Sequence, residues 1–163
     1  GGGTRQPVIG AVQHAAFLMT TVNKSALVPY SASEMYALVA DIESYGEFLP
    51  WCGGARVLAR DAENITAAID IAYSGVHKTF TTRNRGVPGA EMEMHLVDGP
   101  FKRLQGYWRF QALDTTACKV SLHLEFEFAN AMLRLLVGPV FSGIANGLVD
   151  SFRQRAVALY GKR

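Results

Sequence analysis

The sequence predicts an α+β fold, with a broad antiparallel sheet packed against one long C-terminal helix. Apolar residues recur at steps of three and four over residues 130–160, which is the spacing of one helix face. Over most of residues 56–128 apolar and polar residues alternate, which is typical of strands with one buried and one solvated face. No earlier segment has a helical pattern of comparable length. One long helix must therefore cover a wide apolar sheet face, and a strongly twisted sheet can curl around it.

Composition and length indicate a single globular domain. The chain has 163 residues, of which 49% are hydrophobic and 18% charged. Its net charge of +2 is too small to indicate nucleic-acid binding by itself. Cys52 and Cys118 have no motif spacing, so we expect free thiols.

The N-terminal residues are expected to lie outside the domain. The first methionine is Met19, so we interpret residues 1–18 as an N-terminal extension or an expression remnant, and residues 19–163 as the domain. No segment is expected to span a membrane. The most apolar run, residues 131–149, contains Arg134, Ser142 and Asn146, whereas a span needs about 20 mostly apolar residues.

The first elements are a strand and a short helix. Residues 20–28 read as a strand that ends at Pro29. Ser31 or Ser33 is suited to cap a helix with Glu34 in its first turn and Met35, Leu38 and Val39 on its buried side. A compact segment, residues 45–54, follows with a proline and paired glycines that end the helical region.

The alternating region is expected to hold about six further strands. Turn signals interrupt the alternation at Ser74-Gly75, at residues 86–89 and at Asp98-Gly99-Pro100. Strand-forming residues lie on both sides of each turn, so consecutive strands should pair as antiparallel neighbours.

The final helix is predicted over residues 130–160. Asn130 is a suitable N-cap, and Pro139 should kink the helix or divide it. One apolar face carries Leu133, Val137, Phe141, Ile144, Leu148, Phe152, Ala156 and Leu159. Gly138, Gly143 and Gly147 indicate a close backbone approach, a flexible lid or tight packing, and the sequence leaves all three open.

Catalytic and metal-binding patterns are weak, and no catalytic residue or metal ligand is assigned. His77, His95 and His123 fall on the polar strand faces and lack the short spacing of metal ligands. Glu125 and Glu127 share a strand face, which is interpreted as solvated. Cys52 is interpreted as a packed thiol, because no nucleophile motif surrounds it.

Basic and aromatic residues suggest a second kind of surface. Lys102, Arg103 and Arg109 form one basic group, for which a solvated face is the default interpretation and phosphate contact the alternative. Trp51 lies in a loop-like segment, where it would anchor a partner or close the end of the sheet.

Four motifs in order resemble a known family. They are residues 98–110 (DGPFKRLQGYWRF), Tyr45 with Phe48-Leu49-Pro50-Trp51-Cys52, residues 124–128 (LEFEF), and residues 138–152 with their Gly-Pro-Val-Phe and Val-Asp-Ser-Phe segments. Over about residues 19–160 the chain resembles the ribosome-association toxins (RatA) and the mitochondrial coenzyme-Q-binding proteins, within the START-like polyketide cyclase/dehydrase superfamily. Gly46 departs from the proline that is usual in these relatives.

The resemblance implies the helix-grip fold, a curved seven-stranded antiparallel sheet around a long C-terminal helix, as the periodicity also indicates. It also implies two activities, the binding of ubiquinone in support of respiration and binding to the large ribosomal subunit that blocks subunit association. A cyclase or aromatase is a third possibility, which requires at least two polar side chains pointing into a cavity.

The first hypothesis is a non-enzymatic protein that binds ubiquinone or a similar polyprenyl lipid and requires no cofactor. Apolar burial alone would hold such a tail. The expected ligand-binding residues are Ile69, Ile71, Phe80, Met92, Met94, Leu104, Trp108, Leu122, Phe126, Val137, Phe141, Ile144 and Leu148. The same pattern is compatible with a core that these side chains fill completely.

The alternative hypothesis assigns ribosome contact to Trp51, Lys102, Arg103 and Arg109, with Trp51 exposed. DNA is not an expected partner. The expected location is the cytoplasm, with at most peripheral contact to the inner membrane.

Overall fold

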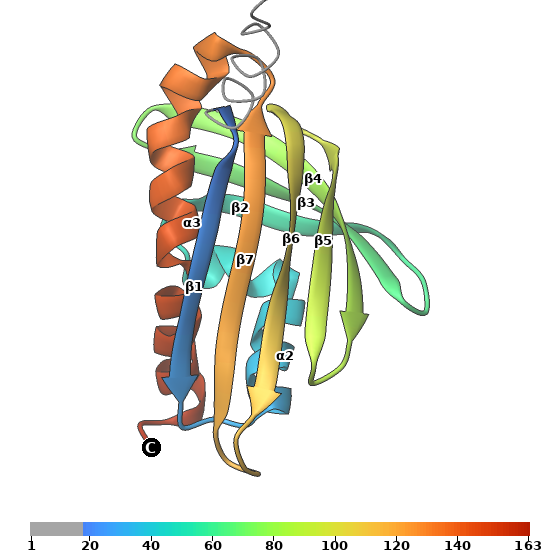
Figure 1. The fold of residues 1–163 in the computed structure, drawn as a ribbon, viewed down its shortest axis with the longest axis vertical. Helices are drawn as coiled ribbons and strands as arrows, with labels where there is room; N and C mark the ends of the chain where they lie inside the picture. The colour runs from blue at the N-terminus through green and yellow to red at the C-terminus, as the bar shows by residue number, and fades with distance from the viewer. Residues whose placement is uncertain (1–17) are drawn as a thin grey trace, which may run out of the picture.

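A computed structural model describes residues 18–163 of the chain. One seven-stranded antiparallel sheet, ordered β1-β7-β6-β5-β4-β3-β2, curves around the C-terminal helix (Figure 1). This confirms the predicted fold class. The proposed extension, residues 1–18, lies outside the described residues except for Leu18.

The strands follow the predicted alternation closely. The first strand is β1 (Thr20–Val28), and the six later strands are β2 (Cys52–Arg60), β3 (Asn64–Tyr73), β4 (Val76–Val87), β5 (Glu91–Asp98), β6 (Phe101–Ala112) and β7 (Cys118–Phe128). The turns fall at the predicted signals. The sheet begins four residues earlier than the alternation indicates, because β2 starts at Cys52. The pairing of β2 with β3 is irregular between Cys52 and Gly54, so apolar and polar residues do not alternate regularly there.

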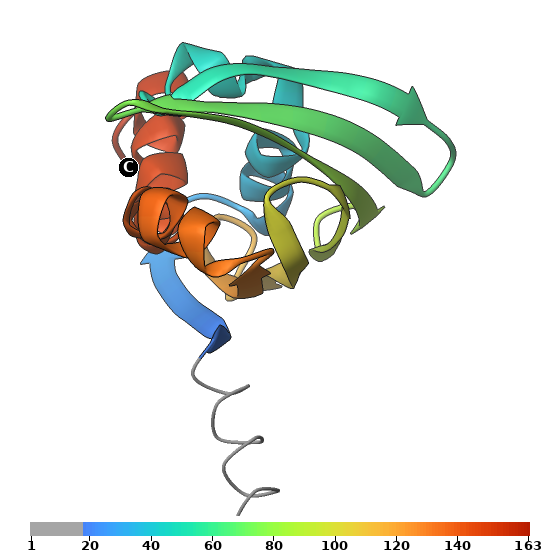
Figure 2. The same ribbon diagram turned by 90° about the horizontal axis from the view of Figure 1, so that it is seen from above.

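Curvature of the sheet produces its concave inner face. Figure 2 shows the strands curling into a half-barrel, with both longer helices on the concave side. Gly106 of β6 pairs with Leu124 of β7, and a Cβ on Gly106 would overlap the carbonyl oxygen of His123. The two strands therefore approach closely only because residue 106 has no side chain.

Two short helical segments close one end of the sheet. Helix α2 (Ala32–Ala40) begins with a capping box in which the Ser31 hydroxyl accepts from the Glu34 N–H, and the Glu34 carboxylate accepts from the Ser31 N–H. Ser31, not Ser33, is thus the N-cap. The 3₁₀ helix η1 (Ile42–Glu47) follows directly and packs against β2.

Helix α3 (Ala131–Tyr160) is the core helix of the fold. Asn130 caps it through a 2.9 Å bond from the Leu133 N–H, as predicted. Pro139 lies inside one continuous helix, whose first turns lean away from the axis of the rest (Figure 1). The predicted apolar face is largely buried, although Leu159 near the C-terminal end is exposed. Within residues 18–163, α3 is the one helix whose length and composition would allow it to cross a bilayer, and here it packs against β1, β7 and α2.

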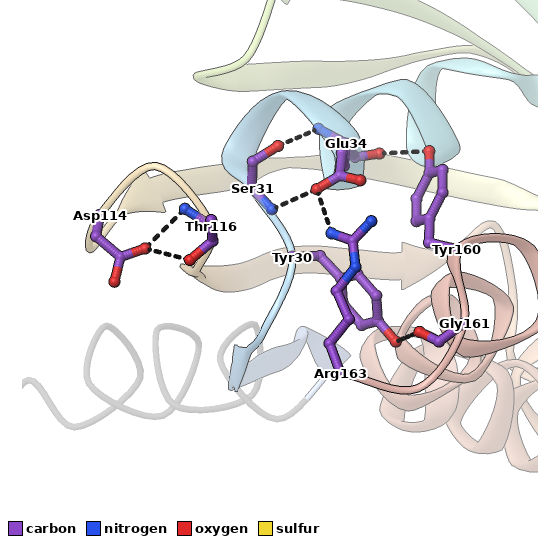
Figure 3. A network of polar contacts seen from close by, with 8 residues as sticks. All are labelled: Tyr30, Ser31, Glu34, Asp114, Thr116, Tyr160, Gly161 and Arg163. Atoms are coloured by element: carbon purple, nitrogen blue, oxygen red, sulfur yellow. Dashed lines mark hydrogen bonds and ion pairs between the residues drawn. The ribbon is translucent and has the colours of Figure 1, made fainter.

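The C-terminal end of α3 is tied to the start of α2. Figure 3 shows the Tyr30 hydroxyl donating to the Gly161 carbonyl at 2.6 Å and the Tyr160 hydroxyl donating to the Glu34 carbonyl at 3.2 Å. The Arg163 guanidinium forms an ion pair with the Glu34 carboxylate at 2.8 Å. Asp114 and Thr116, also in Figure 3, close the β6–β7 turn. The opposite end of α3 carries three exposed apolar side chains, Met132, Leu135 and Leu136.

Two aromatic clusters fill much of the space between sheet and helix. One consists of Phe80, Phe101, Phe126, Phe128 and Phe141, and the other of Tyr45, Phe48, Trp108, Phe110 and Phe152. Most of these rings meet edge to face at centroid distances near those preferred by aromatic pairs.

Candidate ligand-binding cavity

A cavity of about 70 Å³ remains between the concave face of the sheet and α3. Strands β3 to β7 supply one wall, α3 supplies the other, and η1 with the segment after it closes one end. The lining consists of Ile42, Tyr45, Trp51, Ile69, Phe80, Thr82, Asn84, Met94, Leu104, Trp108, Leu122, Leu124, Phe141, Ile144, Ala145, Leu148 and Phe152. No charged side chain is present in this lining, which is drawn entirely from the described residues.

Most of the apolar residues that the sequence suggested for ligand binding lie in this wall. They are Ile69, Phe80, Met94, Leu104, Trp108, Leu122, Phe141, Ile144 and Leu148. Four others, Ile71, Met92, Phe126 and Val137, are buried in the packed core and do not line the cavity. Strand alternation identifies the inward face, but it does not distinguish a side chain beside a void from one that is covered by aromatic rings.

Trp51 does not occupy the exposed position that the ribosome hypothesis gave it. Its side chain is only 9% exposed and lines the cavity. The Ala72 N–H donates to the Trp51 carbonyl, which ties this segment to the end of β3. Backbone pairing therefore turns the ring inward, although the sequence around it resembles a loop.

Thr82 and Asn84 are the polar side chains of the cavity that sequence reasoning missed. Both lie an even number of residues from Phe80 on β4, so they face the same side of the sheet as Phe80. This alternation is the signal in the sequence that could have identified them. Pairing between β4 and β5 is irregular at Thr81 and Thr82, as often occurs beside functional sites. Both residues are buried, and their positions show that the cavity is not purely apolar.

Tyr45 is the titratable side chain in the cavity lining. Its hydroxyl donates to the Val39 carbonyl, and burial raises the pKa of this phenol well above its usual range. The two cysteines are free and buried. Burial raises the pKa of Cys52 and raises that of Cys118 to about 11, so neither thiol is reactive near neutral pH.

A shallow groove adjoins the cavity on the outside of α3. It is lined by Pro50, Trp51, Tyr73, Pro139, Val140, Gly143 and Ile144. Trp51 and Ile144 also line the cavity, so these two side chains separate the internal space from the outer groove.

The outer face of the sheet carries the basic residues. Lys102 and Arg103 are exposed beside an irregular pairing at the start of β6, and Arg103 lies 3.8 Å from the Glu127 carboxylate. Arg109 stacks over the Tyr107 ring at 3.9 Å, and Tyr107 stacks on His123. A shallow groove there is lined by Asn23, Lys24, Ser25, Tyr107, Arg109, Gln111, Lys119, Ser121, Leu122 and His123. Sequence reasoning missed Lys24 and Lys119, which line this groove from β1 and β7. Lys119 pairs with Gln111 and shares the strand face of Arg109, whereas Lys24 pairs with Leu122 from the edge strand β1.

The histidines and acidic residues have structural surroundings. His77 and His95 are exposed, and His123 lies between Asn23 and the Glu125 carboxylate. Glu127 is buried, unlike the solvated residue expected, since it lies at the end of β7 under the β6 bulge. No group of three His, Cys, Asp or Glu residues suited to a metal ion is found within residues 18–163.

Comparisons with known proteins agree on one family for this chain. The family described as "Polyketide cyclase / dehydrase and lipid transport" matches residues 28–153. The ribosome association toxin RatA of Escherichia coli strain K12 is 45% identical over 146 residues, which cover 90% of this chain and 92% of the toxin. The mitochondrial coenzyme Q-binding protein COQ10 homolog B of Xenopus laevis is 24% identical over 145 residues, covering 86% of this chain and 59% of that protein.

Solved structures share the same fold. The Zhui aromatase/cyclase of Streptomyces sp. R1128 superposes with a TM-score of 0.71 at 18% identity, covering 89% of this chain and 99% of that one. An 18 kDa protein of Caulobacter crescentus superposes with a TM-score of 0.68 at 29% identity, covering 88% and 99% of the two chains. The matched domain, the helix-grip architecture and the four motifs agree, and the chain belongs to the polyketide cyclase/dehydrase and lipid transport family, as a relative of the RatA and coenzyme-Q-binding proteins.

Proposed function

We propose that this protein is a non-enzymatic carrier of ubiquinone or a similar polyprenyl lipid. The observation that carries the proposal is the cavity under α3, which has an apolar and aromatic wall and no charged side chain among the described residues. An apolar ligand there gains roughly 25 cal/mol for each Å² of its surface removed from water. A relative named as a coenzyme Q-binding protein supports this ligand class.

Binding of a ring requires the cavity to widen. A cavity of about 150 Å³ accommodates benzene, whereas the space here is about 70 Å³. The N-terminal half of α3 is the element suited to move, since it contains Pro139 and the helix-weakening Gly143, and Gly147 follows just beyond it. Outward displacement of this half would separate Ile144 from Trp51 and join the cavity to the outer groove.

The described residues that line the cavity include no carboxylate, histidine or lysine to act as a general acid or base, which supports a carrier over an enzyme. Thr82 and Asn84 meet the condition of two polar side chains in the cavity. Neither ionises, and the Tyr45 hydroxyl already donates to the Val39 carbonyl. Cyclase chemistry requires a group that transfers protons at the reacting atoms, so we assign no catalytic residue and no required cofactor.

The carrier is proposed to work in the cytoplasm, in peripheral contact with the inner membrane. Met132, Leu135 and Leu136 expose an apolar surface at the end of α3 that is suited to move. Exposed apolar patches of this kind commonly mark membrane or partner contacts. A ligand leaving the bilayer would reach the outer groove beside Pro139.

A lipid extraction tests this function directly. Protein purified from its own host should contain quinone that mass spectrometry detects, and added quinone should quench the fluorescence of Trp51 and Trp108, which line the cavity. Leu148→Trp should fill the cavity and abolish binding, whereas Leu159→Trp, the same change at an exposed position near the C-terminal end of α3, should bind normally. No co-purified lipid and no binding of added quinone would exclude the proposal.

A second candidate function is contact with the large ribosomal subunit. The observation in its favour is the outer groove that Lys24, Arg109 and Lys119 line together with Tyr107, since lysine and arginine bind phosphates and aromatic rings stack on bases. A relative 45% identical is named as a ribosome association toxin. Cavity and groove lie on opposite faces of the sheet, so one chain has room for both activities.

Sedimentation with large subunits at low salt tests the second function. The triple change Lys24→Glu, Arg109→Glu and Lys119→Glu should abolish co-sedimentation, and Lys102→Glu with Arg103→Glu should weaken it. Lys78→Glu, exposed on β4 away from this groove, is the matched control. Wild-type binding should fall steeply with salt, because phosphate contacts release counterions. Failure of the wild type to co-sediment at low salt would remove this candidate.

A further inference from the structure

Asn84 is a buried polar residue whose side-chain oxygen has no hydrogen-bond partner. Its side chain is 6% exposed and lines the cavity. Its Oδ1 is the only buried side-chain nitrogen or oxygen within residues 18–163 that lacks a hydrogen-bond partner. Native proteins pair nearly all such atoms, so an orphan of this kind calls for a specific explanation.

The cross-strand partners of Asn84 supply no hydrogen-bond donor from their side chains. Its cross-strand partners are Ile65 on β3 and Met94 on β5, and both are apolar. The next row on the same strand face contains Thr82, whose hydroxyl also belongs to the cavity lining. Thr82 and Asn84 thus place a small polar patch in a wall of aliphatic and aromatic side chains.

Folding alone gives no reason for asparagine at this position. A leucine has nearly the same size and would bury no unpaired oxygen, and an unpaired oxygen is costly in an apolar interior. Residues that reduce stability in this way are typical of binding sites, where a ligand completes the hydrogen bonds.

We propose that Asn84, with Thr82 beside it, anchors the polar end of the ligand, and that the anchor prefers a neutral hydroxyl-bearing ring such as a hydroquinone. This inference rests on the proposed carrier function. The unpaired atom is a carbonyl oxygen, which accepts a hydrogen bond and therefore selects a donor. The Thr82 hydroxyl donates or accepts and is suited to a second ring oxygen.

The same lining disfavours other classes of lipid. Fatty acids and phospholipids carry anionic groups, and no lysine, arginine or histidine lines the cavity in the described part of the chain. The ring oxygens of an oxidised quinone only accept hydrogen bonds, so they cannot donate to the Asn84 oxygen. The aromatic rings of Phe80 and Trp108 complement a flat ring at the polar end of an apolar tail.

Three ligands with one short prenyl tail test the anchor. They are the hydroquinone, the matching quinone and the hydroquinone dimethyl ether, which has no hydroxyl donor. Titrations followed by tryptophan fluorescence, under nitrogen with a reductant for the hydroquinone, should show the wild type binding the hydroquinone on the order of tenfold more tightly than the ether.

Asn84→Leu should remove this preference and leave the affinity for the ether nearly unchanged. Thr82→Val should reduce the preference partly, and Ile65→Val, opposite Asn84 on β3 and outside the cavity lining, should preserve it. Without ligand, Asn84→Leu should melt at a higher temperature than the wild type. If Asn84→Leu does not fold, the wild-type comparison of hydroquinone with ether still decides the matter.

The outcomes separate the anchor from the carrier function. The anchor would be overturned if the wild type bound hydroquinone and ether equally, or if Asn84→Leu kept the preference for the hydroquinone. Either result would leave the carrier function intact, and Asn84 would then bind internal water only. Binding of none of the three ligands by the wild type would overturn the carrier function and the anchor together.

Discussion

Single residues fix both ends of the fold around the cavity. Glu34 caps α2, forms an ion pair with Arg163 and accepts a hydrogen bond from Tyr160 through its carbonyl (Figure 3). Its carboxylate thus joins the start of the domain to the end of α3. The Arg163 hydrogen bond and the Ser31 N–H lower the pKa of this carboxyl below its usual value of 4.5.

Glu34→Gln should reduce stability near neutral pH and have less effect in acid. A lowered folded-state pKa means that the ionised group stabilises the protein above the unfolded pKa, and that this contribution is lost as pH falls through the folded pKa. Glutamine keeps the capping box and removes only the charge. Urea unfolding at about pH 7 and about pH 3 should give a difference from wild type that shrinks at the lower pH, with Glu43→Gln as the control. A difference that grows in acid would contradict the assignment.

Gly106 is the residue on which the close approach of β6 and β7 depends. Gly106→Ala should destabilise the protein by roughly 1–3 kcal/mol, as expected of overpacking, because its Cβ would overlap the His123 carbonyl oxygen. Gly46→Ala should change stability by less than about 0.5 kcal/mol, since nothing lies within 4 Å of its added Cβ. The free energy of unfolding in urea measures both. Similar values for the two variants would show that the sheet does not require glycine at residue 106.

At the scale of elements, α3 has one fixed and one weakened half. Hydrogen bonds from Tyr30 and Tyr160 secure its C-terminal end. Around Pro139 the helix lacks one backbone donor, and nothing lies within 4 Å of an added Cβ at Gly143 or Gly147. These two glycines are therefore not explained by close packing, and the flexible lid stays a prediction. Gly138 has only ordinary contact with Phe128.

Gly143→Ala and Gly147→Ala should each stabilise the protein by about 0.5–1 kcal/mol, because alanine favours the helix and meets no clash. Thermal unfolding measures this effect. If the weakened half of α3 opens the cavity, the double variant should also bind quinone more slowly in stopped-flow fluorescence. An unchanged association rate in a stabilised double variant would show that another element opens.

At the scale of the whole molecule, the sheet separates two surfaces of opposite character. Its concave face holds the apolar cavity, and its convex face holds the groove with Arg109 and Lys119, which Lys24 borders from the edge strand β1. Leu148 is not among the residues that line the groove, and Lys24, Arg109 and Lys119 are not among those that line the cavity. The two candidate activities are therefore expected to be independent of each other.

Combining Leu148→Trp with the triple charge reversal at Lys24, Arg109 and Lys119 tests this independence. Each change should abolish its own activity, and their effects on the free energy of unfolding should add within about 0.5 kcal/mol. Quinone at 100 times its Kd should stabilise the charge-reversed protein by about 2.7 kcal/mol, as for any single-site ligand, and Leu148→Trp not at all. Loss of quinone binding in the charge-reversed protein would show that the two faces are coupled.

Much of the fold could be predicted because short stretches of sequence determine where each strand and helix forms. The period of two placed the strands, the three–four spacing placed α3, and Ser31 and Asn130 marked the helix starts. Antiparallel neighbours joined by short turns also fixed most of the strand order. The early start of β2 was missed, because its irregular pairing with β3 breaks the alternation.

The sequence by itself determined which residues face inward, the helix-grip fold and the family. Only the tertiary structure decided which of the inward-facing residues border a cavity and which are covered by other side chains. Ile71 and Phe126 share the inward face with Ile69 and Leu122, yet only the latter pair borders the cavity. It also decided that Trp51 turns inward and that Asn84 lacks a partner. Periodicity reports the direction of a side chain from its own backbone, whereas voids and unpaired atoms depend on every neighbour that strand pairing and helix packing bring together.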